Sequence, residues 1–473
     1  MPRRTTILRS VTLGGLCVGL LLYGLGAAQT PQQPQPPPQG KTYFPTVEQD
    51  FAKVRADDQA AKPTVIQRQQ ALLTERYDLS NIPAPGLMMS GGRKAVQQGV
   101  RVKLPAGQTW ERLAAMSPDE IREKDLFPKG FLPLPHVKHA TGGMVFPKFE
   151  ISEINKQEGR SLERFDVDFD LPDHLVPEFP PPLFLTTRPE LGDVSRGQLL
   201  TIRNYFAILD GILTPVQMEG MRLLLTPFPQ QQFNQTDDRK TDVQSLGVTC
   251  LDCHSNGHTN GAFHQNPDNR PQTARLRIET VSLRGVFNQL IHGSKRSLRS
   301  VEDFTEFEQR TAYFDGDHVI AAKKGLNLPD RASQVAMMAQ MQNMFDFPPA
   351  PKLTALGTLD PTKATEEERL GQEVFFGKGR CGTCHPASSY LDNQMHDLKV
   401  ERFYTARTIN DEWIHAEGPI KTFTLRGIKD SPPYMHDGRL LTLEDTVEFF
   451  NLVLGVQLTP REKSALVAFM RQL

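Results

Sequence analysis

The sequence predicts a mainly α-helical protein in which two related domains follow an irregular, proline-rich N-terminal region. The main observation is that the second half of the chain repeats a set of short motifs at a constant offset of 142 residues. The clearest segments of the chain begin with helix-capping residues, which predicts helices. The length of 473 residues exceeds what one hydrophobic core usually serves, which predicts more than one domain. The formal net charge of -1 provides no basic excess to neutralise phosphates, so we expect no nucleic acid partner.

Residues 1–28 have the pattern of an export signal. Three arginines precede an apolar run over about residues 11–25, and small residues follow it. We expect cleavage after Ala28 and an exported protein, periplasmic or beyond. An uncleaved anchor helix is the alternative, although the apolar run is short for a membrane span.

Residues 29–192 are the proline-rich region. Of the 37 prolines in the chain, 22 lie in the first 200 residues, a density that breaks helices and favours an irregular layer wrapped over another part of the molecule. The Pro/Gln tract at residues 31–40 is expected to act as a tether. Residues 46–77 contain short helical patterns. Residues 169–191 have the character of an extended connector, and their aromatic and aliphatic side chains predict that it packs down.

The two related domains are predicted at residues 193–348 and 349–473. Residues 279–307 align with residues 421–449 without a gap. The shared positions are Thr280/Thr422, Leu283/Leu425, Arg284/Arg426, Gly285/Gly427, Glu302/Glu444, Asp303/Asp445, Glu306/Glu448 and Phe307/Phe449. Two related domains are the simplest account of this match.

Each domain also opens with an amphipathic helix pattern, at residues 214–225 and 365–376. Both begin with a Thr cap and carry Gln or Glu three residues later. The first domain has about twenty extra residues, 228–247, which are polar and predicted to form a surface loop. The chain ends in a predicted helix capped by Thr459, with Pro460 at its first position.

A C-x-x-C-H motif follows the first helix of each domain. The motif residues are Cys250, Cys253 and His254 in the first domain and Cys381, Cys384 and His385 in the second. This spacing lets two thiols add to the vinyl groups of one porphyrin while the histidine ligates its iron. We therefore expect two covalently bound haem c groups. A zinc site would leave the histidines unexplained, and no βαβ pattern supports a redox dithiol.

The motifs and the segments around them resemble the bacterial di-haem cytochrome c peroxidases and their MauG-like relatives. The resemblance is looser over about residues 195–345 and does not extend to residues 29–190. It is close in the second domain, over the segments RCGTCHPASSYLDNQMHDLKV, TFTLRGIKDSPPYMHDGRLLTLEDTVEFF and LTPREKSALVAFMRQL. It implies two cytochrome c-like haem domains, one haem reacting with peroxide and the other relaying electrons from a small cytochrome or cupredoxin. It also admits a homodimer and a structural Ca²⁺, for which the sequence shows no carboxylate cluster.

The second domain departs from the family at the position that closes its haem with Met or Tyr. Here that position is Phe450, which cannot ligate iron. Either this iron is five-coordinate or another side chain substitutes. The nearby candidates are Met435, His436, Met395 and His396.

The first domain departs further, because it lacks the family's Trp-Asp-Gly-Arg turn and its later Glu-Met pair. His258, His264 and His292 are the candidates for the distal side of the first haem. We expect His264, whose distance after His254 suits a loop folding back over the ring. Glu302 is the expected acid/base, with its helix neighbour Glu306 as the alternative. Both match repeat positions in the second domain, which favours a structural role in a helix.

Together these inferences predict an exported di-haem c-type cytochrome. It would act as a peroxidase-like oxidoreductase that reduces hydrogen peroxide with electrons from a small redox protein. Two alternatives stay open. One is a non-catalytic electron carrier with both irons six-coordinate, and the other is a MauG-like oxidation of an organic or protein substrate.

Overall fold

The computed structural model describes residues 47–49, 51–137, 144–160, 170–227, 239–241, 249–265, 277–308 and 331–473. The chain divides into two compact units, Met1–Gln35 and Pro36–Leu473, and the described residues all belong to the second. The predicted export signal, the Pro/Gln tract and most of the insertion at 228–247 lie outside them. None of the helices in the described part of the chain has both the length and the apolar character needed to cross a bilayer.

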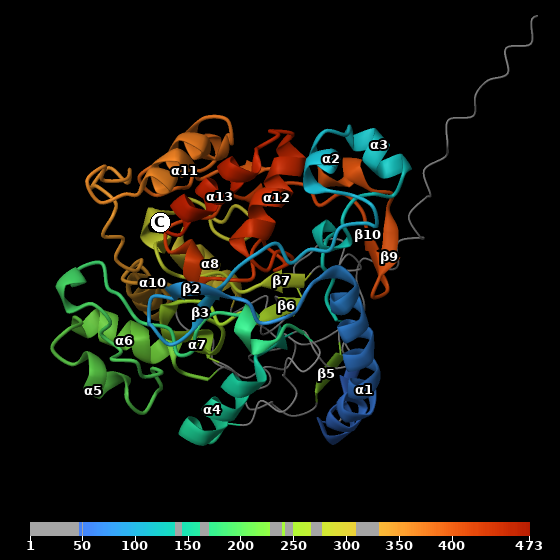
Figure 1. Cartoon of the computed structure of the whole chain (residues 1–473). Helices are drawn as coiled ribbons and strands as arrows, with labels where there is room; N and C mark the ends of the chain where they lie inside the picture. Colours follow the sequence, from blue (N-terminus) through green and yellow to red (C-terminus); the bar gives the residue numbers. More distant parts are fainter. Residues whose placement is uncertain are drawn as a thin grey trace, which may run out of the picture. The chain divides into compact units, whose positions relative to one another are not determined.

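The described elements are mostly helices with a few short strands (Figure 1). The α-helices are α1 (Phe51–Arg76), α2 (Trp110–Ala114), α3 (Pro118–Glu123), α4 (Lys148–Glu158), α5 (Tyr205–Leu209), α6 (Pro215–Leu224), α7 (Cys250–Cys253), α8 (Val301–Phe307), α10 (Ala336–Gln342), α11 (Glu366–Phe376), α12 (Leu443–Leu454) and α13 (Pro460–Met470). Short 3₁₀ turns link them, and those used below are η5 (Val286–Asn288) and η10 (Ile428–Asp430).

The strands form small separate sheets. One has the order β4 (Met144–Val145), β6 (Phe263–Gln265), β7 (Arg277–Glu279), all antiparallel. The others are pairs: β1 (Val47–Gln49) parallel to β5 (Arg239–Thr241), and the antiparallel pairs β2 (Pro83–Met88) with β3 (Ala95–Gln97), β8 (Met395–His396) with β11 (Ile420–Lys421), and β9 (Arg407–Ile409) with β10 (Glu412–Ile414).

The N-terminal region shares its core with the second repeat. Tyr77 and Phe131 belong to the same cluster of buried side chains as Phe449 of α12, and the Phe131 and Phe449 rings meet edge to face with centroids 5.2 Å apart. The backbone N–H groups of Arg101 and Val102 both donate to the carboxylate of Asp445, at 2.7 and 2.9 Å. The region is therefore built into the fold, and the domain boundaries named above remain predictions.

Helix α1 differs from the short helical pieces that its sequence predicts, because it runs without a break past Pro63. A proline inside a helix removes one backbone hydrogen bond and crowds the preceding turn. Contacts at the C-terminal end of the helix offset this cost. Leu73 is buried there, and the fully buried guanidinium of Arg76 donates to the carbonyl groups of Leu132 and Pro133.

The connector predicted at residues 169–191 is packed down, as expected, over its described part. Its apolar side chains Leu171, Leu175, Val176, Leu183 and Leu185 are buried. The carboxylate of Asp170 accepts two hydrogen bonds from Arg277 of β7, at 2.9 and 3.0 Å. The connector thus contributes a charged partner to the first repeat as well as apolar packing.

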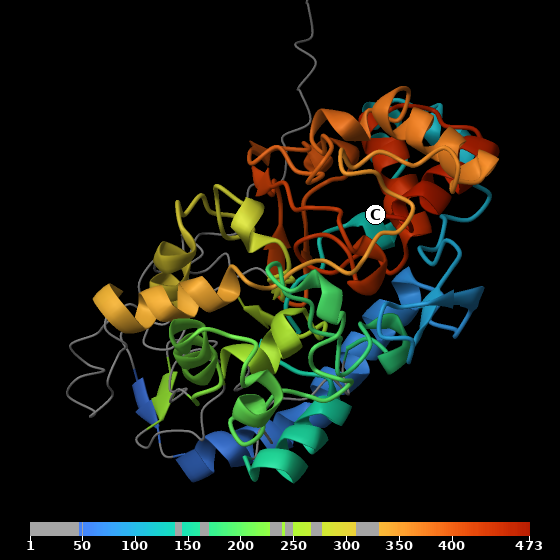
Figure 2. The same cartoon turned by 90° about the vertical axis from the view of Figure 1, so that its left-hand side faces the viewer.

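The internal repeat is confirmed in the structure. Helices α6 and α11 begin with the predicted capping boxes of Thr214 and Thr365, and α13 begins with that of Thr459. At the offset of 142 residues, η5 matches η10 and the start of α8 matches the start of α12. Figure 2 shows the helices of the two repeats as two groups, green to light orange and orange to red.

The two repeats exchange equivalent backbone hydrogen bonds. The N–H of Glu279 donates to the carbonyl of His436, and the N–H of Lys421 donates to the carbonyl of Ser294, both at 2.9 Å. Residue 421 is the repeat counterpart of residue 279, and residue 436 is that of residue 294. The contact is therefore reciprocal: each repeat uses the same position to reach the same loop of the other.

Each repeat contains a close helix crossing at a glycine. Gly371 of α11 faces the backbone of α13, and a methyl group there would overlap the carbonyl oxygen of Ala465; Gly220 of α6 faces Met337 in the same way.

We expect Gly371→Ala to lower the free energy of unfolding by about 3 kcal/mol, because two backbones would have to separate. Chemical denaturation measures this. The control Gly418→Ala meets open space and is expected to cost about 1 kcal/mol; equal losses would contradict the explanation.

Candidate functional site

The first C-x-x-C-H motif lines a cavity in the first repeat, called here the first cavity. Cys250 and Cys253 are the ends of the one-turn helix α7, and His254 follows directly. Thr249 and Asp252 form a capping box that fixes this turn. The two thiols and the imidazole all border the first cavity, together with the side chains His264, Glu279, Lys295, Arg296, Phe304, Phe307 and Glu308.

The loop that carries this motif is clamped by the N-terminal region. The guanidinium of Arg160 donates to both carboxylate oxygens of Asp252, at 2.7 and 2.8 Å, and also pairs with Glu158 at 2.6 Å. Asn260 donates to the backbone carbonyl of Asp252 and to the buried carboxylate of Glu150. The sequence analysis missed this contribution, because residues so far apart carry no local signal.

Removal of this clamp should destabilise the motif loop. We expect Arg160→Met to lower the free energy of unfolding by about 3 kcal/mol, because Asp252 and Glu158 would remain almost buried without a cation. The matched control is Arg188→Met, which breaks the exposed pair with Glu190 and should cost less than about 1 kcal/mol. Denaturant titration of both variants checks the difference, and similar values would rule out the clamp.

The electrostatics of the first motif suit a neutral histidine ligand and two unreactive thiols. Burial lowers the pKa of His254 to about 4, against a smaller opposing effect of the Val281 carbonyl. Its Nδ1 is buried and has no hydrogen-bond partner among the described residues. Burial raises the pKa of Cys250 to about 12 and that of Cys253 well above its usual range. Such thiols make poor thiolates, which argues against a redox dithiol.

The second motif lines a larger cavity, called the second cavity. Cys381, Cys384 and His385 all border it. Nδ1 of His385 lies 2.8 Å from the carbonyl oxygen of Tyr390, an arrangement that fixes the ring and leaves Nε2 for a metal. In both motifs the thiols are free of disulfides. Two unpaired thiols and one oriented or unpartnered imidazole at each cavity are the donor set that a covalently attached haem requires, so the residues present fit this cofactor.

The candidate sixth ligands of the second site lie in different surroundings. Met435, His436, His396 and Phe450 all border the second cavity. His396 lies 2.6 Å from the carboxylate of Asp392. Nε2 of His436 lies 3.2 Å from Glu417, while its buried Nδ1 has no partner among the described residues.

The histidines predicted for the first site are separated by the structure. His264, on β6, borders the first cavity, as the prediction requires. His258 borders the second cavity, and its ring nitrogens contact Ser282 and the carbonyl of Asp430 at 2.8 and 3.0 Å. His292 is not among the residues that line either cavity. Glu302, in the first turn of α8, is not among them either, and its acid/base role stays a prediction.

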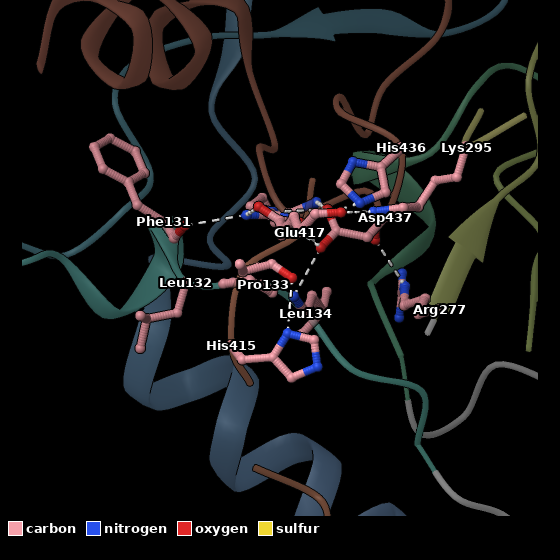
Figure 3. A network of polar contacts seen from close by, with 12 residues as sticks. Phe131, Leu132, Pro133, Leu134, Arg277, Lys295, His415, Glu417, His436 and Asp437 are labelled. Carbon is pink, nitrogen blue, oxygen red and sulfur yellow. Dashed lines mark hydrogen bonds and ion pairs between the residues drawn. The ribbon is translucent and has the colours of Figure 1, made fainter. Parts of the chain in front are cut away.

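A buried network of charged groups includes Lys295, which borders the first cavity, and His436, which borders the second (Figure 3). Arg439, which is fully buried, donates to the carboxylates of both Glu417 and Asp437. The carbonyl of Asp437 accepts from Arg277 at 2.9 Å, and Lys295 donates to the carbonyl of Glu417. Burial alone would raise the pKa of Glu417, but the Arg439 guanidinium holds it well below its usual range.

The network also bears on metal binding. Glu417, His436 and Asp437 lie close enough to hold a metal ion, but Arg439 already supplies the positive charge that their carboxylates need. Among the described residues, the other such group is Cys384, Asp392 and His396, which has a single carboxylate. Arg439 engages both carboxylates of the first group and the second group has only one, whereas Ca²⁺ takes about six to eight oxygen ligands. The structural Ca²⁺ therefore stays an expectation from the resemblance.

Glu279 marks the place where the two cavities meet. Residues Glu279, Thr280 and Val281 border both cavities. Burial raises the pKa of Glu279 well above its usual range, against the smaller opposing effects of Thr259 and Arg277. Its hydroxyl partner is Thr259, at 3.2 Å. The sequence analysis missed Glu279, although its position directly before the shared Thr280 of the repeat was a usable signal.

Comparison with known proteins finds distant relatives over part of the chain. The cytochrome-c peroxidase IdrP2 of Denitromonas iodatirespirans is 30% identical over 151 residues, 24% of this chain and 41% of that protein. The methylamine utilization protein MauG of Methylorubrum extorquens is 27% identical over 133 residues, 25% of this chain and 37% of that protein. This chain is a distant homologue of the di-haem cytochrome c peroxidases and MauG. The homology covers about a quarter of the chain and about two fifths of these relatives.

The other comparisons add little to this relationship. No protein-family model matches the chain. A solved MauG-like protein associated with microbial copper homeostasis aligns with 56% of this chain and 90% of its own, at 17% identity and a TM-score of 0.38. A chain of Kuenenia stuttgartiensis hydrazine synthase aligns with 59% of this chain and 94% of its own, at 20% identity and a TM-score of 0.34. Both TM-scores are too low to argue from.

Proposed function

We propose that this homologue of the cytochrome c peroxidases and MauG is an exported di-haem c-type cytochrome that reduces hydrogen peroxide with electrons from a small redox protein. The observation that carries the proposal is that each C-x-x-C-H motif borders its own cavity and that the two cavities meet at residues Glu279–Val281. Adjacent sites of this kind suit a protein in which one centre reacts and the other supplies electrons. Haems bound there would provide both the electron transfer and the reaction with peroxide.

The residues of this chain would serve two purposes: some hold the haems, and others hold or transfer protons near the peroxide. The four motif cysteines would attach the two haems, and His254 and His385 would ligate their irons. We assign the reaction with peroxide to the first cavity, because it brings His264 and the carboxyl of Glu279, whose pKa burial raises, to the same space as His254. These side chains can hold or move a proton next to a bound peroxide.

In the second cavity, Met435 is our choice for the second axial ligand. Its thioether borders the cavity, whereas Nε2 of His436 is engaged by Glu417. His436, the next residue along the chain, then positions Met435 through its contact with Glu417. A closed second site suits an electron relay that receives electrons from a small cytochrome or cupredoxin.

Electron paramagnetic resonance of the full, matured chain tests the assignment. We expect one high-spin ferric signal from the first site, one low-spin signal from the second, and turnover of peroxide with a reduced cytochrome donor. The variant His264→Gln should lower turnover, while the control His415→Gln, at an exposed position, should not. Two low-spin signals without turnover in any redox state would overturn the proposal in favour of a non-catalytic electron carrier.

A MauG-like oxidation of an organic or protein substrate is the second candidate. The observation that favours it is the match to MauG itself, at 27% identity. Both candidate functions predict a high-spin ferric signal. In the second candidate, however, the electrons come from the organic or protein substrate and not from a small redox protein. Oxidation of an added organic or protein substrate by peroxide, without a reduced donor, would support this candidate and count against the peroxidase.

A further inference from the structure

Lys421 is a buried cation at the edge of the second cavity. It ends the short strand β11, is 3% exposed and borders this cavity. Its backbone N–H bonds to Ser294 of the other repeat. Its ammonium group donates to the side-chain carbonyl of Gln289 and lies 4.4 Å from the centre of the Phe423 ring. No carboxylate among the described residues forms an ion pair with it.

Two other cations of the second cavity, Arg284 and Arg426, have partners outside its lining. Arg284 lies 3.3 Å from the carboxylate of Asp430, and Arg426 donates to the carbonyl of Leu473 at 2.9 Å. The one carboxyl group among the lining residues is that of Glu279, and burial raises its pKa, which disfavours a negative charge there. In addition, the buried Nε of Arg284 has no hydrogen-bond partner among the described residues. The second cavity therefore has an excess of positive charge and of unused donors.

An excess of buried positive charge indicates an anionic occupant. Burial lowers the pKa of Lys421 to about 7 in the chain alone, and a nearby anion would favour the charged ammonium again. A haem carries two propionate groups, which are anionic at neutral pH. The backbone carbonyl of Phe423, two residues after Lys421, is a hydrogen-bond acceptor for the ring of His385. Lys421 thus lies on the chain segment that passes beside the expected iron ligand.

We propose that Lys421 binds a propionate of the haem attached at Cys381 and Cys384, and that its positive charge raises the reduction potential of that haem. The proposal rests on the haem binding in the proposed function but not on its peroxide chemistry. A fixed cation beside the haem favours the reduced iron, which carries one positive charge fewer than the oxidised iron. At the equivalent position the first repeat has Glu279, so the repeats differ in charge type at this site.

The test compares the full, matured chain with three variants by spectroelectrochemical titration. Lys421→Gln removes the charge and should shift one of the two midpoint potentials to a more negative value. Lys421→Arg keeps the charge and should leave both midpoints close to the wild-type values. The control Lys363→Gln removes a charge from a position whose side chain is 57% exposed, and it should shift neither.

Resonance Raman spectra of the same samples report on the propionate directly. Lys421→Gln should move the propionate bending band of one haem, and a haem-loaded Lys421→Gln with unchanged midpoints and bands would overturn the proposal. A structure of the haem-loaded wild-type chain decides independently of any variant. Nζ of Lys421 within hydrogen-bonding distance of a propionate supports the proposal, and a longer distance overturns it.

These measurements separate the inference from the proposed function. Peroxide turnover enters none of them, so a chain that holds both haems but does not reduce peroxide would contradict the peroxidase alone. A chain with no haem in the second cavity would overturn both. Unchanged midpoint potentials in Lys421→Arg, together with a shifted midpoint potential in Lys421→Gln, support the inference whether or not the protein reduces peroxide.

Discussion

Replacing Arg439 with methionine is expected to lower the free energy of unfolding by about 3–5 kcal/mol, the usual cost of removing one partner from a buried ion pair. Arg439 is fully buried and pairs with both Glu417 and Asp437. Methionine fills much of the same volume, so the main loss is the cation that compensates two buried carboxylates. Equilibrium denaturation at pH 7 measures the effect.

The pH dependence of this variant provides a sharper test. In the wild type the pKa of Glu417 is depressed, so its contribution to stability is present above the ordinary glutamate pKa and is lost as the pH falls below it. Without Arg439 the burial of Glu417 raises its pKa, and protonation then relieves the penalty. The difference in stability between wild type and variant should therefore shrink from about pH 8 to about pH 5.

An exposed pair provides the control for Arg439. Arg461 lies 3.2 Å from Glu366, and both side chains are largely exposed. We expect Arg461→Met to cost less than about 1 kcal/mol, since water and salt screen such pairs. If the two variants lose similar stability, or if the Arg439 difference grows as the pH falls, the network does not act through its buried charges.

Replacing both cysteines of one motif with alanine is expected to remove one covalently bound haem. In Cys381→Ala/Cys384→Ala the second cavity loses both thioether positions, and in Cys250→Ala/Cys253→Ala the first cavity does. Each double variant should retain half of the covalent haem of the wild type. Haem staining after denaturing electrophoresis and intact-mass measurement count the attached groups.

Each of the two double-cysteine variants is the matched control for the other. If both motifs attach haem, the two double variants lose equal amounts, and a chain lacking all four cysteines has none. Full covalent haem in either double variant would contradict attachment at that motif. A chain that binds zinc in place of haem would also contradict it, because zinc needs the thiolates that burial disfavours here.

The features that the sequence predicted well are those carried by local patterns. Thr214, Thr365 and Thr459 cap helices because each is followed three residues later by Gln or Glu, a signal that needs no tertiary context. The repeat was visible because its identities lie at one constant offset. The motif histidine His385 is held by the carbonyl of Tyr390, five residues away, so its ring orientation is fixed by a local contact.

The features that escaped prediction depend on contacts between distant residues. Pro63 indicated a broken helix, but packing at the end of α1 outweighs it. Lys421 and Glu279 have no special local sequence, and their burial results from the meeting of the two repeats. No local pattern reports a burial that another part of the chain creates.

The reciprocal bonds of Glu279 to His436 and of Lys421 to Ser294 have the form of a twofold contact between identical subunits, in which position i of each copy meets position j of the other. Two copies of a single ancestral repeat could make the same pair of bonds as a homodimer. A duplication that joined those copies in one chain would have turned an intermolecular interface into an internal one. Each copy could then change its sequence independently, whereas in a symmetric homodimer every substitution appears in both copies. The different residues at the equivalent positions, Glu279 and Lys421, are an example of such independent change.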